Sequence, residues 1–196
     1  MINSTFWISI AFLVSGWCLY FFLHSLLAAH STKELFKRWM GVGFRFYRLG
    51  YVVFSSGGLL LLLFFNANIS SEYLFNHQGA ARYLSLMFAA FGVIVIKISF
   101  RSYQFSEFVG WSTQEEPFTT RGILSSVRHP IYSGTILIAI GYWLFNPTVP
   151  TTASVMCILA YLPVGIHLEE RKLIKQFGQR YIKYKCDVPA LIPRLF

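Results

Sequence analysis

Long apolar runs separated by short polar stretches dominate the chain. Five apolar segments stand out, at residues 6–29, 46–65, 81–100, 131–145 and 151–168. A helix needs roughly 20 apolar residues to cross the hydrocarbon core of a bilayer, so the first three segments are long enough alone and the last two are short. The pattern predicts an all-α, polytopic membrane protein with about five transmembrane helices.

The last two apolar segments form a natural pair. Asn146, Pro147 and Pro150 lie between them, and such residues are typical of a tight turn. We therefore expect the two short helices to form a helical hairpin that closes at one face of the membrane.

A different periodicity follows the hairpin. Leu173, Phe177, Tyr181 and Tyr184 are spaced 4, 4 and 3 residues apart, which places them on one face of a helix. Most of the lysines in this stretch lie elsewhere on that helix. The spacing predicts a C-terminal amphipathic helix in the membrane interface, and Gly178 is the point where such a helix could break.

Domain organisation follows from this order of elements. We expect a single membrane domain over residues 1–196. Its N-terminal part, residues 1–100, contains the first three helices, and residues 101–196 contain a loop, the hairpin and the final helix.

Charge fixes the expected orientation. Lys and Arg number 17 against 8 Asp and Glu, giving a net charge of +9. The basic residues lie between apolar runs, so membrane lipid rather than nucleic acid is the expected partner. If the N-terminus is outside and the C-terminus cytoplasmic, all basic residues except Arg82 lie on the inner side, as the positive-inside rule requires.

The first apolar segment is expected to remain in the mature protein. No basic residue precedes it, and Lys33, Lys37 and Arg38 follow it, which is the reverse of a signal peptide. The three cysteines have neither the pattern of a disulfide framework nor the spacing of a metal site, so no metal is expected.

Candidate chemistry begins just before the hairpin. Pro130 suits the first turn of a helix, which puts Arg128 and His129 directly ahead of a helix N-terminus. Backbone amides, the positive helix end and a guanidinium together favour an anionic group such as a carboxylate or phosphate. The alternative is that both side chains anchor the protein to lipid headgroups.

Glu169 and Glu170 form a second candidate, at the inner end of the last apolar segment. Ionised carboxylates beside hydrocarbon are costly unless they are paired. Arg128 on the other leg of the hairpin, or a cationic ligand, would supply a partner. Solvation at the interface, beside the adjacent cations Arg171 and Lys172, is the simpler alternative.

The N-terminal half offers a weaker third candidate. His24 approaches the inner end of the first helix, and Arg45 and Tyr47 open the second. These polar groups are expected either to line a substrate pocket or to anchor the helices at the interface.

Two motifs now occur in order across the hairpin, at 128–134 (RHPIYSG) and 169–173 (EERKL), followed by Phe177, Gly178 and two tyrosines. Over about the last 80 residues this arrangement resembles the integral-membrane methyltransferases, namely isoprenylcysteine carboxyl methyltransferase and the phospholipid N-methyltransferases. The stretches 24–28 and 45–49 resemble the branch that contains methanethiol S-methyltransferase and the NnrU-like proteins.

The resemblance implies S-adenosylmethionine as the cofactor, held in a pocket that faces the cytoplasm, with a methyl acceptor entering from the membrane. The acceptor would be a membrane-borne or small hydrophobic molecule that carries a carboxylate, a lipid amine or a thiol. A thiol or ammonium must lose a proton, for which His129 or a Glu is a candidate. The residues that the resemblance assigns to cofactor binding are Gly122, Val127, Arg128, His129, Tyr132, Glu169 and Glu170.

Among these, Arg128, His129 and Glu170 are the candidate catalytic residues, and His24, Arg45 and Tyr47 are the candidate acceptor site. Two alternatives stay open at this point. A sterol-reductase-like enzyme that uses NADPH has a similar C-terminal layout, and an NnrU-like membrane component would have no catalytic activity. Pro130 and the glutamate pair favour the methyltransferase.

Overall fold

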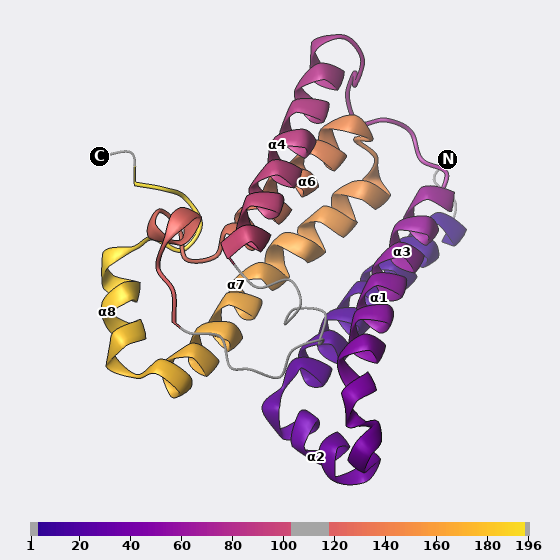
Figure 1. Cartoon of the computed structure of the whole chain (residues 1–196). Helices are drawn as coiled ribbons and strands as arrows, with labels where there is room; N and C mark the ends of the chain where they lie inside the picture. The colour runs from indigo at the N-terminus through magenta and orange to yellow at the C-terminus, as the bar shows by residue number, and fades with distance from the viewer. Residues whose placement is uncertain (1–3, 103–117, 195–196) are drawn as a thin grey trace.

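The computed structural model describes residues 4–102 and 118–194, and these residues are almost entirely helical (Figure 1). The loop predicted near the start of the 101–196 part lies largely outside the described residues. The elements in chain order are α1 (Ser4–Ala28), α2 (His30–Met40), the 3-10 helix η1 (Gly41–Phe46), α3 (Tyr47–Asn68), α4 (Ala80–Ser102), the 3-10 helix η2 (Gly122–Ser125), α6 (Pro130–Phe145), α7 (Val149–Phe177) and α8 (Gln179–Asp187).

The predicted all-α membrane architecture is confirmed. In the described part of the chain, four helical stretches are long and apolar enough to cross a membrane, at Ser4–Ala28, His30–Asn68, Ala80–Arg101 and Val149–Phe177. The remaining predicted helix, α6, is apolar but has only 16 residues. The protein is therefore a multi-pass membrane protein.

Helix α7 is longer than the apolar pattern predicts. The last apolar segment ends near residue 168, but α7 has 29 residues and continues to Phe177. The predicted amphipathic helix is therefore divided: its first half extends α7, and its second half is α8. Gly178 separates the two halves with a φ of 57°, a conformation that glycine adopts without steric cost.

Helices α4 and α6 pack closely where glycine residues leave room for the neighbouring backbone. A Cβ added to Gly134 would lie 2.6 Å from Cγ1 of Ile96 and 2.8 Å from the carbonyl oxygen of Gly92. One added to Gly141 would lie 2.7 Å from the carbonyl oxygen of Ser85. Small residues let membrane helices approach in this way, so α4 and α6 pack backbone to backbone at these positions.

A buried polar network joins α1, α3, α6 and α7. Asn66 is at its centre, donating to the Tyr142 hydroxyl at 2.8 Å and accepting from the Ser154 hydroxyl at 2.9 Å. Ser154 in turn accepts from the Trp17 indole at 2.9 Å, and Thr151 lies within 3.3 Å of the Asn66 amide. Because hydrogen bonds are hard to replace in hydrocarbon, the network fixes the register of these helices.

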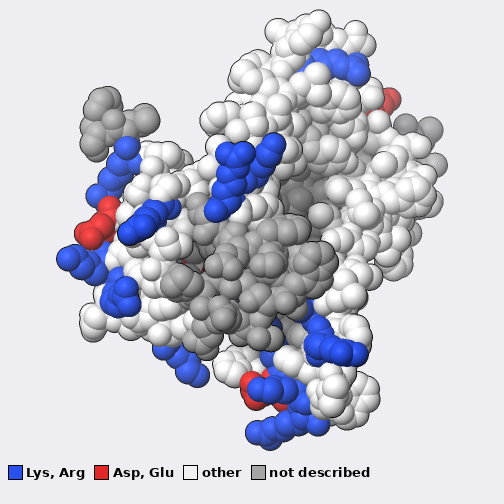
Figure 2. Space-filling view, viewed as in Figure 1, with Lys and Arg blue, Asp and Glu red and all other residues white. Residues whose placement is uncertain are grey.

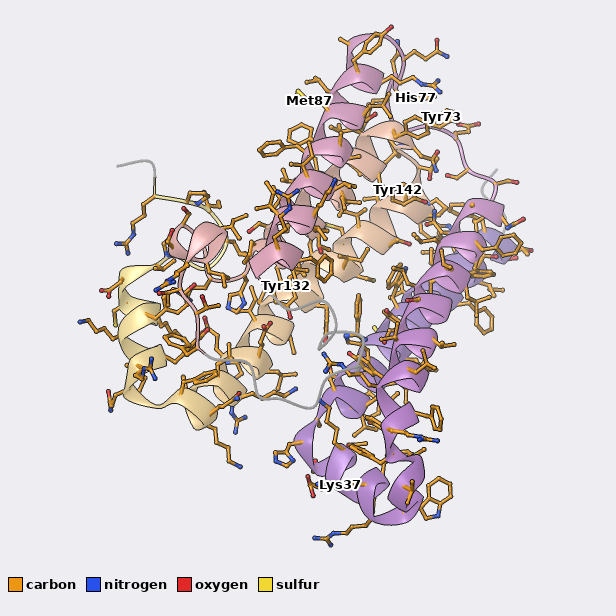
Figure 3. The ribbon with its side chains drawn as sticks, in the orientation of Figure 1. Lys37, Tyr73, His77, Met87, Tyr132 and Tyr142 are labelled. Carbon is orange, nitrogen blue, oxygen red and sulfur yellow. The ribbon has the colours of Figure 1, made fainter. Side chains whose placement is uncertain are left out.

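The two ends of the helix bundle differ in charge. The start of α1, the loop 69–79 and the α6–α7 turn lie toward one end, while α2 and α8 lie away from it (Figure 1). In the visible face, Lys and Arg gather over α2 and α8 (Figure 2). Tyr73 and His77 mark the first end and Lys37 the second (Figure 3). The candidate residues of the 128–134 and 169–173 motifs belong to the basic end.

Candidate functional site

Arg128 and Glu170 form an ion pair across the hairpin. Nε and Nη2 of Arg128 donate to Oε1 of Glu170 at 3.0 and 2.8 Å. The two side chains are only 9% and 7% exposed. Nη1 of Arg128 also donates to the carbonyl oxygens of Lys185 and Val188. The guanidinium thus ties the start of α6 to α7 and to the end of α8.

The chain that follows α8 occupies the amides at the start of α6. The backbone N–H groups of Arg128 and His129 donate to the carbonyls of Pro189 and Ala190 at 2.9 and 3.0 Å. We expected amides at this helix start to favour an anionic ligand. These two donors instead hold the C-terminal strap, defined here as residues 188–191.

Glu170 is fully satisfied by positive and polar partners. Besides Arg128, Nζ of Lys185 lies 2.5 Å from its Oε2, and Nε2 of His129 lies 3.2 Å from its Oε1. A buried carboxylate requires such compensation. Arg128 was the partner expected from the sequence. Lys185 was not expected, because only the fold of α8 back toward the hairpin brings it to Glu170.

His129 lies between the two adjacent glutamates. Its Nε2 faces Glu170, and its Nδ1 is 3.6 Å from Oε2 of Glu169. The imidazole is 2% exposed, whereas the Glu169 side chain is 42% exposed. Consecutive residues of α7 therefore have different settings: Glu170 is enclosed and paired, and Glu169 borders open space.

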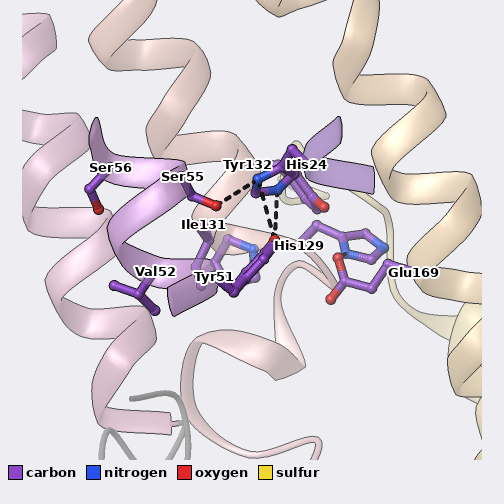
Figure 4. A pocket seen from close by; sticks show the side chains of 10 residues that line it. His24, Tyr51, Val52, Ser55, Ser56, His129, Ile131, Tyr132 and Glu169 are labelled. Carbon is purple, nitrogen blue, oxygen red and sulfur yellow. Dashed lines mark hydrogen bonds and ion pairs between the residues drawn. The ribbon is translucent and has the colours of Figure 1, made fainter. Parts of the chain in front are cut away.

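That space is a cavity of about 410 Å³ between α3, α6, α7 and the C-terminal half of α1 (Figure 4). Its polar lining comes from His24, Tyr51, Ser55, His129, Tyr132 and Glu169, and Val52, Pro130 and Ile131 are among its apolar walls. The cavity thus joins side chains of both sequence motifs to the N-terminal candidate His24.

Two further cavities lie beside the first. One of about 170 Å³ is lined by Lys172 and Tyr161 together with His24, and one of about 590 Å³ is lined by Lys33 and Tyr47. Tyr51 and Glu169 line all three cavities, which therefore adjoin one another.

His24 is held by hydroxyl groups of α3. Ser55 Oγ lies 3.1 Å from its Nδ1, and the Tyr51 hydroxyl lies 3.0 Å from its Nε2 (Figure 4). Tyr51 and Ser55 are four residues apart, so they project from the same helix face. Neither Tyr51 nor Ser55 was identified as a site residue from the sequence, although polar residues at that spacing in an apolar segment were an available signal.

The other predicted residues lie apart from one another. Tyr47 lines the 590 Å³ cavity, and its hydroxyl donates to the Leu27 carbonyl at 2.7 Å. Arg45 is outside the three cavities described above and lies over the Phe46 ring at 4.7 Å. Gly122 starts η2 with a φ of 64°. Val127 is buried against a separate apolar cavity that borders α4 and the C-terminal strap.

Helix α8 packs on the loop before α6 through two buried tyrosines. The Tyr184 hydroxyl donates to the Leu124 carbonyl at 2.5 Å, and burial raises the pKa of Tyr184 to about 12. Burial also raises the pKa of Tyr181, whose buried hydroxyl has no hydrogen-bond partner within the described residues. α8 thus completes the enclosure around Glu170.

Comparison with known proteins gives a consistent result. A model of the phospholipid methyltransferase family matches residues 80–180. Methanethiol S-methyltransferase 2 of Bradyrhizobium diazoefficiens is 29% identical, over 88% of this chain and 69% of its own length. A methanethiol S-methyltransferase of Crocosphaera subtropica is 31% identical, over 87% of this chain and 69% of its own.

A shorter match covers the C-terminal motifs. Protein-S-isoprenylcysteine O-methyltransferase B of Arabidopsis thaliana is 29% identical over 41% of each chain. The chain spans about two thirds of the length of the methanethiol S-methyltransferases that it resembles. No solved structure matches it.

Proposed function

The chain belongs to the phospholipid methyltransferase family, and from this premise we propose that it transfers a methyl group from S-adenosylmethionine to a small thiol at the cytoplasmic face of the membrane. That it is a membrane methyltransferase follows from the family itself, so the NADPH-dependent reductase and the non-catalytic component are set aside. The methyl donor, the acceptor and the orientation are the proposal.

The observation that carries the proposal is the group of adjoining cavities near the basic end of the helices. It brings Glu169, His129 and Tyr132 from the two motifs together with the polar groups of α1 and α3. When bound, S-adenosylmethionine supplies an electrophilic methyl group on a positively charged sulfur. Its size and mixed charges require a space that is partly polar and partly aromatic.

The lining fits such a donor. The half-exposed carboxylate of Glu169 accepts hydrogen bonds from an ammonium or an adenine amine. The rings of Tyr51 and Tyr132 offer faces to a sulfonium cation. Lys33 and Lys172 line the inner cavities and supply positive charge for the donor's carboxylate.

Arg128 and Glu170 act in this proposal as positioning residues. Their charges and hydrogen bonds are directed at one another, at Lys185 and at the C-terminal strap. They hold His129 and the neighbouring Glu169 at the cavity wall. Gly122 and Val127 shape the loop that leads into this arrangement, and neither residue lines the three cavities.

The acceptor is inferred from the charge of the 410 Å³ cavity. Among the described residues, none that line it is a lysine or arginine, and Glu169 contributes a negative charge. A carboxylate acceptor or the phosphate of a lipid headgroup would lack a cationic partner on these walls. A small thiol is uncharged on entry and suits walls of Val52, Pro130 and Ile131, and two of the relatives are named as methanethiol S-methyltransferases.

Calorimetric titration with S-adenosylmethionine tests the donor site. We expect wild-type protein in detergent to bind it, and Glu169→Gln to bind it about 10- to 100-fold more weakly, because a hydrogen bond to a charged group contributes about 1.5–3 kcal/mol. Glu34→Gln, an exposed change on α2, is the matched control and should bind like wild type. Folded wild-type protein that binds neither S-adenosylmethionine nor S-adenosylhomocysteine would refute the proposal.

A further inference from the structure

We propose that His24 is the general base that removes the proton from the acceptor thiol in the 410 Å³ cavity. The inference rests on the proposed function and assigns a step within it. It follows from the different surroundings of the two histidines that line this cavity, His24 and His129.

His129 belongs to the 128–134 motif, but its ring faces carboxylates. Glu170 lies 3.2 Å from its Nε2, and Glu169 lies 3.6 Å from its Nδ1. The imidazole is also only 2% exposed. Both of its nitrogens are therefore engaged by protein groups, and a thiol in the cavity has poor access to either.

His24 has the opposite environment. Its ring nitrogens contact the hydroxyls of Ser55 and Tyr51, which are neutral and can either donate or accept. Aromatic rings of Tyr20 and Tyr161 border the imidazole. No carboxylate contacts it in the described part of the chain, so a neutral ring with one unprotonated nitrogen is the expected resting form.

Charges around the cavity support the same assignment. Lys172 lines the 170 Å³ cavity together with His24, and its positive charge disfavours a second cation at rest. Glu169 lines the same cavity and balances the imidazolium once the proton has been taken up. The groups that face His24 thus favour a neutral ring before the reaction and tolerate a charged one during it.

The contacts of His24 hold its ring on both sides. Ser55 Oγ lies 3.1 Å from Nδ1, and the Tyr51 hydroxyl lies 3.0 Å from Nε2 and 3.3 Å from Nδ1. Either hydroxyl can accept from the protonated nitrogen or donate to the unprotonated one. Ser55 and Tyr51 are therefore positioning residues for the base, fixed on consecutive turns of α3.

The step balances without any further reagent. The S–H bond of the acceptor breaks and its proton passes to the unprotonated ring nitrogen of His24, leaving the electron pair on sulfur. The thiolate forms a bond to the methyl carbon while the sulfonium carbon–sulfur bond breaks, and that electron pair stays on the departing neutral thioether. The imidazolium afterwards releases its proton to water through the inner cavities.

Rates with two thiols of similar size but different acidity distinguish a general base from a residue with only a structural role. Ethanethiol is almost fully protonated near neutral pH, whereas trifluoroethanethiol is far more acidic and needs little help to ionise. For His24→Gln we expect kcat/KM with ethanethiol to fall by about 100-fold or more, the usual contribution of a general base. With trifluoroethanethiol we expect a loss of less than about tenfold.

His30→Gln is the matched control, because His30 is an exposed histidine at the start of α2, and both thiols should react as with wild type. Binding of S-adenosylhomocysteine by calorimetry should be unchanged in His24→Gln, which shows an intact donor site. Equal losses with both thiols, or an ethanethiol rate within about threefold of wild type, would overturn the role of His24.

The two proposals fail differently. Wild-type protein that binds S-adenosylhomocysteine but methylates neither thiol overturns the inference about His24 and leaves the donor site standing. Wild-type protein that binds no S-adenosylhomocysteine removes the proposed function as well.

Discussion

At the scale of single residues, adjacent side chains have separate tasks because the helix points them in different directions. Glu169 and Glu170 are neighbours in the chain, yet one borders a cavity and the other is enclosed by Arg128, Lys185 and His129. The sequence identified both as candidates for one ligand. The geometry assigns the enclosed residue to holding the structure and leaves the open one for contact with a ligand.

The Tyr184 hydroxyl should stabilise the packing of α8 on the loop before α6. Tyr184→Phe leaves the buried Leu124 carbonyl without its donor, so we expect a loss of about 1–3 kcal/mol of stability. Unfolding of the detergent-solubilised protein by denaturant, followed by circular dichroism, measures it. Tyr83→Phe, at a side chain that is 76% exposed, is the control and should have no effect.

The same residue gives a pH dependence with a defined sign. Burial raises the pKa of Tyr184 to about 12, so the folded state favours the neutral phenol. This contribution is fully present below about pH 10, the unfolded pKa, and is lost as the pH rises toward 12. The stability difference between wild type and Tyr184→Phe should therefore shrink between about pH 9 and pH 12, and a constant difference would contradict the assignment.

At the scale of elements, the contact between α4 and α6 depends on glycine residues. α4 and α6 approach at Gly92 and Gly134 so closely that a methyl group has no room. The apolar pattern predicted both helices, but it could not specify which faces meet, because all faces of a helix in lipid are apolar. Small residues were the one local signal of contact.

Gly134→Ala should separate α4 from α6, because its Cβ would meet backbone and the Ile96 side chain. We expect a loss of about 1–3 kcal/mol from such overpacking, read as a lower midpoint of thermal unfolding. Gly57→Ala is the control, since a Cβ there meets nothing within 4 Å and alanine is the better helix former. An equal effect of the two changes would show that helix propensity, and not contact, sets the result.

At the scale of the whole molecule, charge determines the orientation that we propose. Lys and Arg gather at the end that bears α2 and α8, and the cavity opens toward that end. Accordingly, we expect the exposed Cys186 of α8 to be cytoplasmic and the loop 69–79 to be external.

A membrane-impermeant maleimide tests this orientation. In intact cells it should leave Cys186 unlabelled and should label a variant that combines Ser70→Cys with Cys186→Ser. After the membrane is opened, Cys186 should react. Labelling of Cys186 in intact cells would place the C-terminus outside and reverse the proposed topology.

The sequence by itself determined the membrane class, the five apolar helices and the two motifs, because hydrophobic length and local residue order are enough for these properties. It also brought Arg128 and Glu170 together through the expected hairpin. Only the tertiary structure decided that Arg128 and Glu170 satisfy each other, that the strap takes up the amides before α6, and that His24 shares a cavity with Glu169. These facts depend on contacts between segments more than 40 residues apart, which no local pattern encodes.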